Sequence, residues 1–186
     1  MNTRDALIAA ATDLLDSGVD AVTLREVGHR AGVSHNAPYK HFADKQALLA
    51  AVAARELAEL AESMHLSAEE RRTPGTLLQA VMLHYVAWSL RHPERFKLVF
   101  GAWSVESPEL SEQANASWTL VVHAVAEAQK SGELPAGQDS ERLAALIRAT
   151  VHGAISLALA GHLSADGKGH ADPADVVRDL FAHFCA

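Results

Sequence analysis

A short stretch near the amino terminus gathers the cationic side chains that could bind phosphate groups. Residues 22–45 carry four Lys or Arg against two Asp or Glu, whereas residues 51–186 carry 11 Lys or Arg against 17 Asp or Glu. The whole chain has a formal net charge of −7. Because a few cations on one face can attract phosphate, this stretch is the candidate for a small phosphate-binding face in an acidic chain.

The side chains of this stretch predict two short helices joined by a tight turn. Thr23 and Glu26 fit a capping box, in which the threonine oxygen accepts from the N–H of the glutamate. The helix that starts there is expected to stop at Gly32. Ser34 can then cap a further helix over about residues 35–41.

An earlier helix, expected over about residues 3–17, supports these two. Pro38 falls in the first turn of the last helix, where the missing N–H costs little. Two short helices supported by a third form a helix-turn-helix, whose second helix presents its N-terminal residues to the major groove of DNA.

The start of that second helix holds side chains that suit the edges of bases. Asn36 could pair with adenine and the methyl group of Ala37 could contact thymine, with His35 beside them. Lys40 and His41 follow at the far end of the helix, where phosphate contact and simple solvation are both consistent with the sequence.

Two more residues have a functional and a structural interpretation. The Tyr39 ring could pack under the preceding helix, whereas the family resemblance given below implies that its hydroxyl contacts a phosphate. Lys45 begins the next helix, where the helix dipole disfavours a cation unless an anion such as phosphate is bound nearby. Phe42 is expected in the core.

Residues 3–52 resemble the DNA-binding domain of TetR-type transcriptional regulators in order and spacing. The segments that carry the resemblance are Ala21–Ser34, Ala37–Phe42 and Asp44–Leu49, and Asn36 departs from the glycine often found there. The resemblance implies a homodimer that represses transcription from a DNA operator until a small-molecule effector enters its C-terminal domain. It gives these candidate DNA-binding residues: Thr23, Arg25, Ser34, His35, Asn36, Ala37, Tyr39, Lys40, His41 and Lys45.

The second half of the chain adds a looser resemblance. Arg91–Phe96 and Val151–Gly153 are similar to segments of the TetR subfamily whose C-terminal domain is named for a Trp-His-Gly motif. Arg148 stands where that subfamily often has its tryptophan.

The remaining sequence reads as helix throughout. Aromatic residues are only 5% of the chain, alanine is abundant, and no segment alternates like a strand. A fourth helix capped by Asp44 should reach about residue 64, and residues 65–75 form the best inter-domain loop. Five more helices follow, which start near residues 76, 93, 108, 140 and 173. We therefore expect an all-α fold of about nine helices, with a helix-turn-helix domain over 1–52 and a ligand-binding and dimerisation domain over 53–186.

Polar and aromatic residues of the second domain are candidates for an effector pocket. His84 shares a helical face with Val81 and Trp88, which suits either a core histidine or one polar group in a mostly apolar pocket. The effector should then be apolar or amphipathic. The same two interpretations apply to the whole candidate set of His84, Trp88, Trp103, Trp118, His123 and His152.

The eighth and ninth helices are the expected dimer interface. Gly153 lies within the eighth helix, where glycine costs about 1 kcal/mol relative to alanine, so another backbone is expected to approach it closely. Packing within one chain explains this glycine equally well. The small residues of the eighth helix and the apolar stripe of the ninth are Ala145, Ala149, Gly153, Ser156 and Ala160, and Val177, Phe181 and Phe184.

Other kinds of chemistry lack a matching pattern. The 11 histidines are never three or four residues apart, and Cys185 is the single cysteine, so we expect no metal site, cofactor or disulfide. Phosphate-loop, nucleophile-elbow and zinc-protease motifs are absent from the sequence. The first apolar run is too short and too acidic for a signal peptide, and Arg148 and His152 interrupt the longest one. A cytoplasmic protein without a membrane span is expected.

Two other classes of function remain open from the sequence. One is a helical-bundle enzyme or sensor whose N-terminal helices only pack against it, and the other is a helical protein-interaction module. Salt-dependent binding to duplex DNA distinguishes the regulator from both, because phosphate neutralisation releases counterions.

Overall fold

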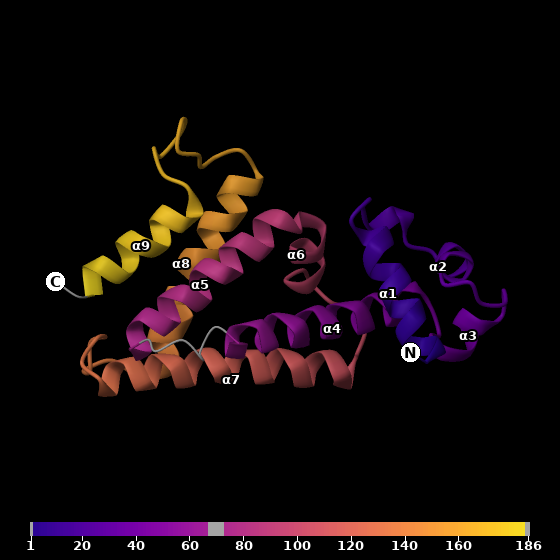
Figure 1. Cartoon of the computed structure of the whole chain (residues 1–186), viewed down its shortest axis with the longest axis horizontal. Coiled ribbons are helices and arrows are strands. Elements are labelled where there is room, and N and C mark those ends of the chain that lie inside the picture. The colour runs from indigo at the N-terminus through magenta and orange to yellow at the C-terminus, as the bar shows by residue number, and fades with distance from the viewer. Residues whose placement is uncertain (1, 67–72, 185–186) are drawn as a thin grey trace. The chain divides into compact units, whose positions relative to one another are not determined.

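The computed structural model describes residues 2–66 and 73–184, with only the backbone of residues 64–66. Over this range the chain forms nine α-helices and one short 3-10 helix, and its only bridge pair is Ser164 with Gly169 (Figure 1). The prediction of an all-α fold is confirmed. Most of the predicted loop 65–75 lies outside the described residues, as does Cys185.

The first three α-helices form the predicted helix-turn-helix. They are α1 (Thr3–Leu15), α2 (Leu24–Arg30) and α3 (Ala37–His41), with the 3-10 helix Val19–Ala21 after α1. Thr23 caps α2 as expected, because its Oγ1 accepts from the N–H of Glu26 at 3.2 Å. Gly32 ends the turn after α2 with a φ of +67°, a conformation that glycine adopts without strain.

The start of α3 differs from the prediction. The helix begins at Ala37 rather than near residue 35 and is preceded by Asn36, whose side chain makes no capping bond. The reason is a tight turn in which the N–H of Ala37 donates to the carbonyl of Ser34 at 2.9 Å. Because of this turn α3 begins later in the sequence, and Ser34 and His35 belong to the loop before it.

A close approach between α2 and α3 fixes their packing. A Cβ atom at Gly28 would lie 2.8 Å from the Pro38 ring, so only glycine fits there. Pro38 itself is buried, which anchors α3 on α2. The helices close over a core of aliphatic residues and Phe42, as predicted for that ring; its largest fully buried members include Leu7, Leu15, Val22, Val27, Leu48 and Leu49.

The remaining helices follow the predicted order. Their bounds are α4 Lys45–Leu66, α5 Pro74–Arg91, α6 Pro93–Val99, α7 Pro108–Lys130, α8 Ser140–Leu159 and α9 Pro173–Phe184. Asp44 caps α4 through a bond from the N–H of Ala47 at 2.8 Å. Asp139 caps α8 in the same way, accepting from the N–H of Arg142 at 2.9 Å.

The chain divides into two compact units that are each discontinuous in sequence. The first unit contains residues 1–59 and 92–115, and the second contains residues 60–91 and 116–186. Therefore α6 and the start of α7 pack with the helix-turn-helix, whereas α5, α8 and α9 pack together in the second unit.

Helix α9 corrects one expectation about the dimer. Val177 is 0% exposed and Phe181 is 5% exposed within the single chain, so neither is left for a partner. Their burial arises because α9 packs on both α5 and α8. Phe184 is half-buried and its ring meets Phe181 edge to face at 6.3 Å.

Helix α8 is long and apolar enough to cross a membrane by length and composition alone. A core helix of a helical domain meets the same criterion, so this resemblance to a membrane span is weak. In the structure α8 buries Leu143, Ile147, Val151 and Ile155 and packs on α5 and α9.

Thr23→Ala should lower the free energy of unfolding by about 1 kcal/mol, because the N–H of Glu26 loses its acceptor at the start of α2. Thr23→Ser keeps the hydroxyl and should remain close to the wild type. Urea titrations followed by circular dichroism, at one protein concentration, measure both variants. Equal stability of the alanine variant and the wild type would contradict a role for this cap.

Candidate nucleic-acid interface and effector site

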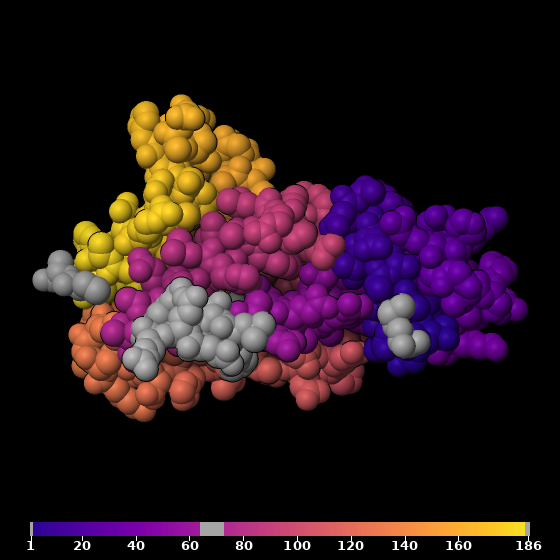
Figure 2. All heavy atoms as spheres, viewed as in Figure 1, coloured from indigo at the N-terminus to yellow at the C-terminus, as the bar shows by residue number. Residues whose placement is uncertain are grey.

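The candidate DNA-binding residues lie on α2, on α3, in the turn between them and at the start of α4. Ala37 and Lys45 are half-buried, and the other eight are exposed. A shallow depression of about 530 Å³ lies beside them, lined by Arg25, His29, Val33 and His35. The space-filling view shows the α2 and α3 region as outer surface of the first unit (Figure 2).

The side chain of Tyr39 lies on the surface of α3. It is 52% exposed and meets the ring of His35 edge to face at 6.0 Å, so it does not pack under α2. Pro38 is on the side of α3 that is buried against α2, whereas the adjacent Tyr39 and Lys40 are exposed to solvent. This arrangement leaves the phenol accessible to a ligand.

Lys45 has a structural bond beside its predicted role. Its Nζ donates to the carbonyl of Val19 at 2.7 Å, which ties the start of α4 to the 3-10 helix. An ammonium group has three donors, so this bond is compatible with a phosphate contact.

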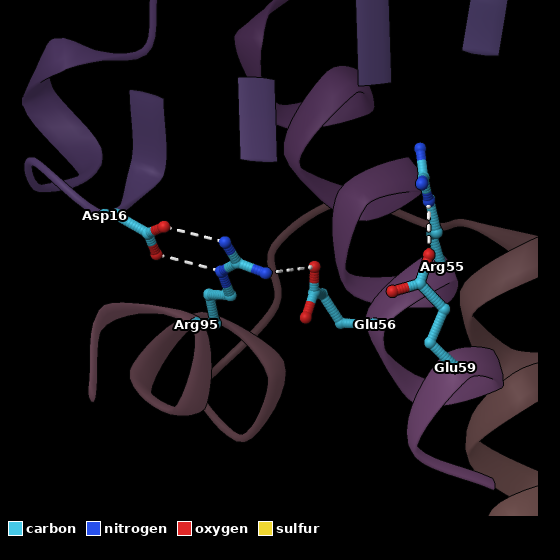
Figure 3. Close-up of polar contacts among 5 residues, drawn as sticks. All are labelled: Asp16, Arg55, Glu56, Glu59 and Arg95. Atoms are coloured by element: carbon cyan, nitrogen blue, oxygen red, sulfur yellow. Dashed lines mark hydrogen bonds and ion pairs between the residues drawn. The ribbon is translucent and has the colours of Figure 1, made fainter. Parts of the chain in front are cut away.

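An ionic bracket holds three elements of the first unit together, and Figure 3 shows it. The guanidinium of Arg95 on α6 donates to both carboxylate oxygens of Asp16, at 2.7 and 2.8 Å. It also donates to Oε1 of Glu56 on α4 at 3.3 Å. Glu56 is only 2% exposed, so Arg95 is the cation that compensates a buried carboxylate.

The two carboxylates of the bracket respond to it in opposite ways. Burial raises the pKa of Glu56, although the positive charge of Arg95 opposes that rise. The hydrogen bonds from Arg95 lower the pKa of Asp16, which is much more exposed. Sequence reasoning missed this bracket, because its members are separated by 39 and 79 residues and share no motif.

The candidate effector residues are only partly brought together. Trp103 belongs to the first unit, whereas the other five belong to the second. His123 is exposed on α7, and His84 bonds to Ser63 through its Nε2 at 2.9 Å. Trp88, Trp118 and His152 are half-buried.

His152 and Trp118 lie in a polar cluster that also includes residues missed by the sequence reasoning. The Oη of Tyr85 lies 2.9 Å from Nδ1 of His152, and the guanidinium of Arg148 lies 5.3 Å from the centroid of the Trp118 ring. The Trp118 Nε1 donates to Glu141 at 3.3 Å. The four-residue spacing of Arg148 and His152 was the available signal, because it places both on one side of a helix.

No group of three or more histidine, cysteine, aspartate or glutamate residues within residues 2–66 and 73–184 is arranged to hold a metal ion.

Comparison with known proteins places the chain in a family. Residues 7–52 match the tetR family of bacterial regulatory proteins. Residues 78–184 match the Tetracyclin repressor-like C-terminal domain. The chain therefore belongs to the TetR family of transcriptional regulators, whose members are regulators rather than enzymes.

The individual relatives agree with this assignment. An uncharacterized HTH-type transcriptional regulator of Mycobacterium tuberculosis is 28% identical over 149 residues, which cover 76% of this chain and 73% of the relative. The structure of a protein of unknown function from Rhodococcus sp. RHA1 is 35% identical with a TM-score of 0.83, covering 100% of this chain and 94% of that chain. SmeT of Stenotrophomonas maltophilia, in complex with triclosan, is 26% identical with a TM-score of 0.62, covering 86% of this chain and 81% of that chain.

Arg95→Gln should destabilise the protein by about 3–5 kcal/mol at pH 7, because it leaves the buried Glu56 carboxylate without its cation. The loss should shrink as the pH falls. The folded-state pKa of Glu56 lies above its ordinary 4.5, so the neutral acid is favoured in the fold and needs no cation once protonated. Urea titrations between pH 7 and pH 4.5 measure this change.

Two further variants control for the bracket. Glu56→Gln in the Arg95→Gln background should recover part of the loss at pH 7. Arg55→Gln removes a neighbouring exposed ion pair with Glu59 (Figure 3) and should cost under about 1 kcal/mol. A loss in Arg95→Gln that does not change with pH would contradict the role assigned to Glu56.

Proposed function

We propose that this regulator is a repressor that binds a pseudo-palindromic operator as a homodimer and is released by a small-molecule effector. In this proposal residues 1–52 contact DNA, residues 53–186 bind the effector and dimerise, and the protein acts in the cytoplasm without catalysis, cofactor or metal. The observation that carries the proposal is the exposed start of α3, where His35 and Asn36 are free of core packing, in a segment matched by the tetR family.

The DNA contacts are proposed from position and chemistry. His35, Asn36 and Ala37 lie where a helix-turn-helix reads base edges. Phosphate contacts are assigned to residues around them, because positioning on the backbone needs donors and cations but no base recognition. These residues are Thr23, Arg25, Ser34, Tyr39, Lys40, His41 and Lys45.

The effector is proposed to bind within the second unit. SmeT, which resembles the chain over its fold, is a repressor of a multidrug efflux pump and has been solved with triclosan. A site among α5, α7 and α8 would include Trp88, Trp118 and His152, with His84 and His123 further along the same helices. Trp103 is kept as a candidate in the first unit.

The dimer interface is proposed on the outer face of α8, with α9 beside it. A Cβ atom at Gly153 would meet nothing within 4 Å, so packing within one chain does not account for this glycine. Leu146 and Leu157 on the same helix are 52% and 49% exposed, and their spacing of seven and four residues from Gly153 puts all three on one side of α8. A partner helix on this face would cover them.

A finer resemblance, to the Trp-His-Gly subfamily, stays a proposal. Val151, His152 and Gly153 support it, and the bond of His152 to Tyr85 gives that histidine a fixed position. The helical-bundle enzyme or sensor and the interaction module remain the alternatives, and loss of duplex binding would favour them.

Lys40→Ala and Tyr39→Phe should weaken binding to all duplex sequences similarly, and Lys40→Ala should reduce the slope of log affinity against log salt by about 1. Asn36→Ala should instead change which bases are preferred, at roughly 1–3 kcal/mol for the lost contact. Fluorescence anisotropy with operator selected from a random duplex pool measures all three. Lys130→Ala, with a cation exposed on α7, is the control, and a salt-independent affinity would exclude the DNA-binding proposal.

Gly153→Leu should convert the dimer into a folded monomer that loses most operator affinity, because one half-site supplies only part of the binding energy. The open space around Gly153 leaves room for the Cβ atom of the new side chain within its own chain. Gly137→Leu is the matched control, since that glycine also has nothing within 4 Å but lies in the loop between α7 and α8. Sedimentation velocity decides the outcome, and an intact Gly153→Leu dimer would contradict the interface.

A further inference from the structure

The polar cluster of the second unit joins a cation to two neutral hydrogen-bonding groups. Tyr85 on α5 is 5% exposed and lies 2.9 Å from Nδ1 of His152 on α8. Arg148 precedes His152 by four residues, which places the two side chains on neighbouring turns of one helix side. Arg148 and His152 both lie at the edge of the buried face of α8, since Ile147 and Val151 beside them are fully buried.

Arg148 is the cation that acts on Tyr85 and His152, and the carboxylate of Glu141 lies on the other side of the cluster, on Trp118 Nε1. Burial raises the pKa of Tyr85, so its phenol stays protonated, while the charge of Arg148 opposes that rise. Burial and the charge of Arg148 both lower the pKa of His152, so its imidazole is neutral at pH 7. Arg148 therefore acts on both groups as a nearby cation, although the chain as a whole carries −7.

The ring of Trp118 lies next to this cation. The guanidinium of Arg148 stacks 5.3 Å from the Trp118 centroid, and the bond from Trp118 Nε1 to Glu141 fixes the indole. The N–H groups of a guanidinium lie in its own plane, a geometry that pairs with a planar carboxylate. Trp88 is half-buried on α5, three residues after Tyr85.

We propose that the effector is an amphipathic monocarboxylate whose carboxylate binds Arg148 and the Nε2–H of His152, with its apolar part against Trp118 and Trp88. Tyr85 is a positioning residue, because a phenol that donates to Nδ1 leaves the ring proton of His152 on Nε2. One cation with neutral donors matches a single negative charge, whereas a phosphate monoester with nearly two charges calls for more cations. This inference rests on the proposed function, since it names the chemical class of the effector.

The test compares acids with uncharged analogues of the same shape on the full-length protein. Octanoate and phenylacetate are titrated beside octanamide and phenylacetamide, with isothermal calorimetry and tryptophan fluorescence as readouts. The acids should bind at least roughly tenfold more tightly than their amides, as charge-assisted bidentate bonds do relative to neutral ones. Acids that bind no more tightly than amides, or no binding of either up to millimolar concentration, would overturn the proposal.

Variants then assign the preference to residues. Arg148→Gln should abolish the preference for acids and Arg148→Lys should retain part of it, because lysine keeps the charge but loses the fork of N–H groups. Arg142→Gln, exposed on the same helix, should keep the full preference. Tyr85→Phe should reduce acid affinity severalfold with an unchanged amide affinity. Circular dichroism confirms folding, and a full acid preference in folded Arg148→Gln would overturn the assignment.

Duplex binding by the same preparations separates this inference from the proposed function. If the protein binds DNA in a salt-dependent way but shows no preference for acids, the proposed carboxylate site is contradicted and the proposed regulatory function stands. If the protein prefers acids through Arg148 but binds no DNA, the carboxylate site stands and the proposed regulatory function is contradicted.

Discussion

The Glu56 carboxylate of α4 is buried, and a buried charge is costly unless a cation lies next to it. Arg95 supplies that cation from α6, and the same guanidinium also holds Asp16 at the end of α1. A buried charge pair adds little net stability in itself, but separation of its partners is costly, so the pair fixes where the helices meet. The ion pairs of Arg95 therefore join the end of α1 to α4 and α6, and α4 continues from this unit into the second.

The two units use polar groups in different ways. In the first, opposite charges satisfy one another inside the unit, and the exposed groups of α3 that are proposed to contact DNA take no part in these ion pairs. In the second, Arg148 stacks on an aromatic ring, and the neutral pair of Tyr85 and His152 lies beside it. The first arrangement joins three helices through opposite charges, whereas the second places a cation near Tyr85 and His152 in the part of the chain proposed to bind the effector.

Local patterns in the sequence predicted most of the helices and the helix-turn-helix. The cap at Thr23, the turn at Gly32 and the cap at Asp44 depend on neighbouring residues, so they could be found by spacing alone. The start of α3 was predicted too early, because the turn between Ser34 and Ala37 is a backbone arrangement that side-chain types do not specify. Contacts between distant segments were missed: the partner of Glu56, the bond between Tyr85 and His152, and the burial of Val177 and Phe181 all depend on how helices pack.

The discontinuity of the first unit has a consequence for how the protein is made. Residues 7–52 leave the ribosome early, but residues 92–115, which complete the unit, follow only after α5 has been synthesised. Arg95 is synthesised 39 residues after Glu56, which takes roughly 2–8 s at ordinary rates of translation. During that interval the helix-turn-helix can already be helical, while the contacts that Arg95 makes with Asp16 and Glu56 have not yet formed. The nascent chain thus forms the surface proposed to contact DNA before it forms the ion pairs between Arg95 and Asp16 and Glu56.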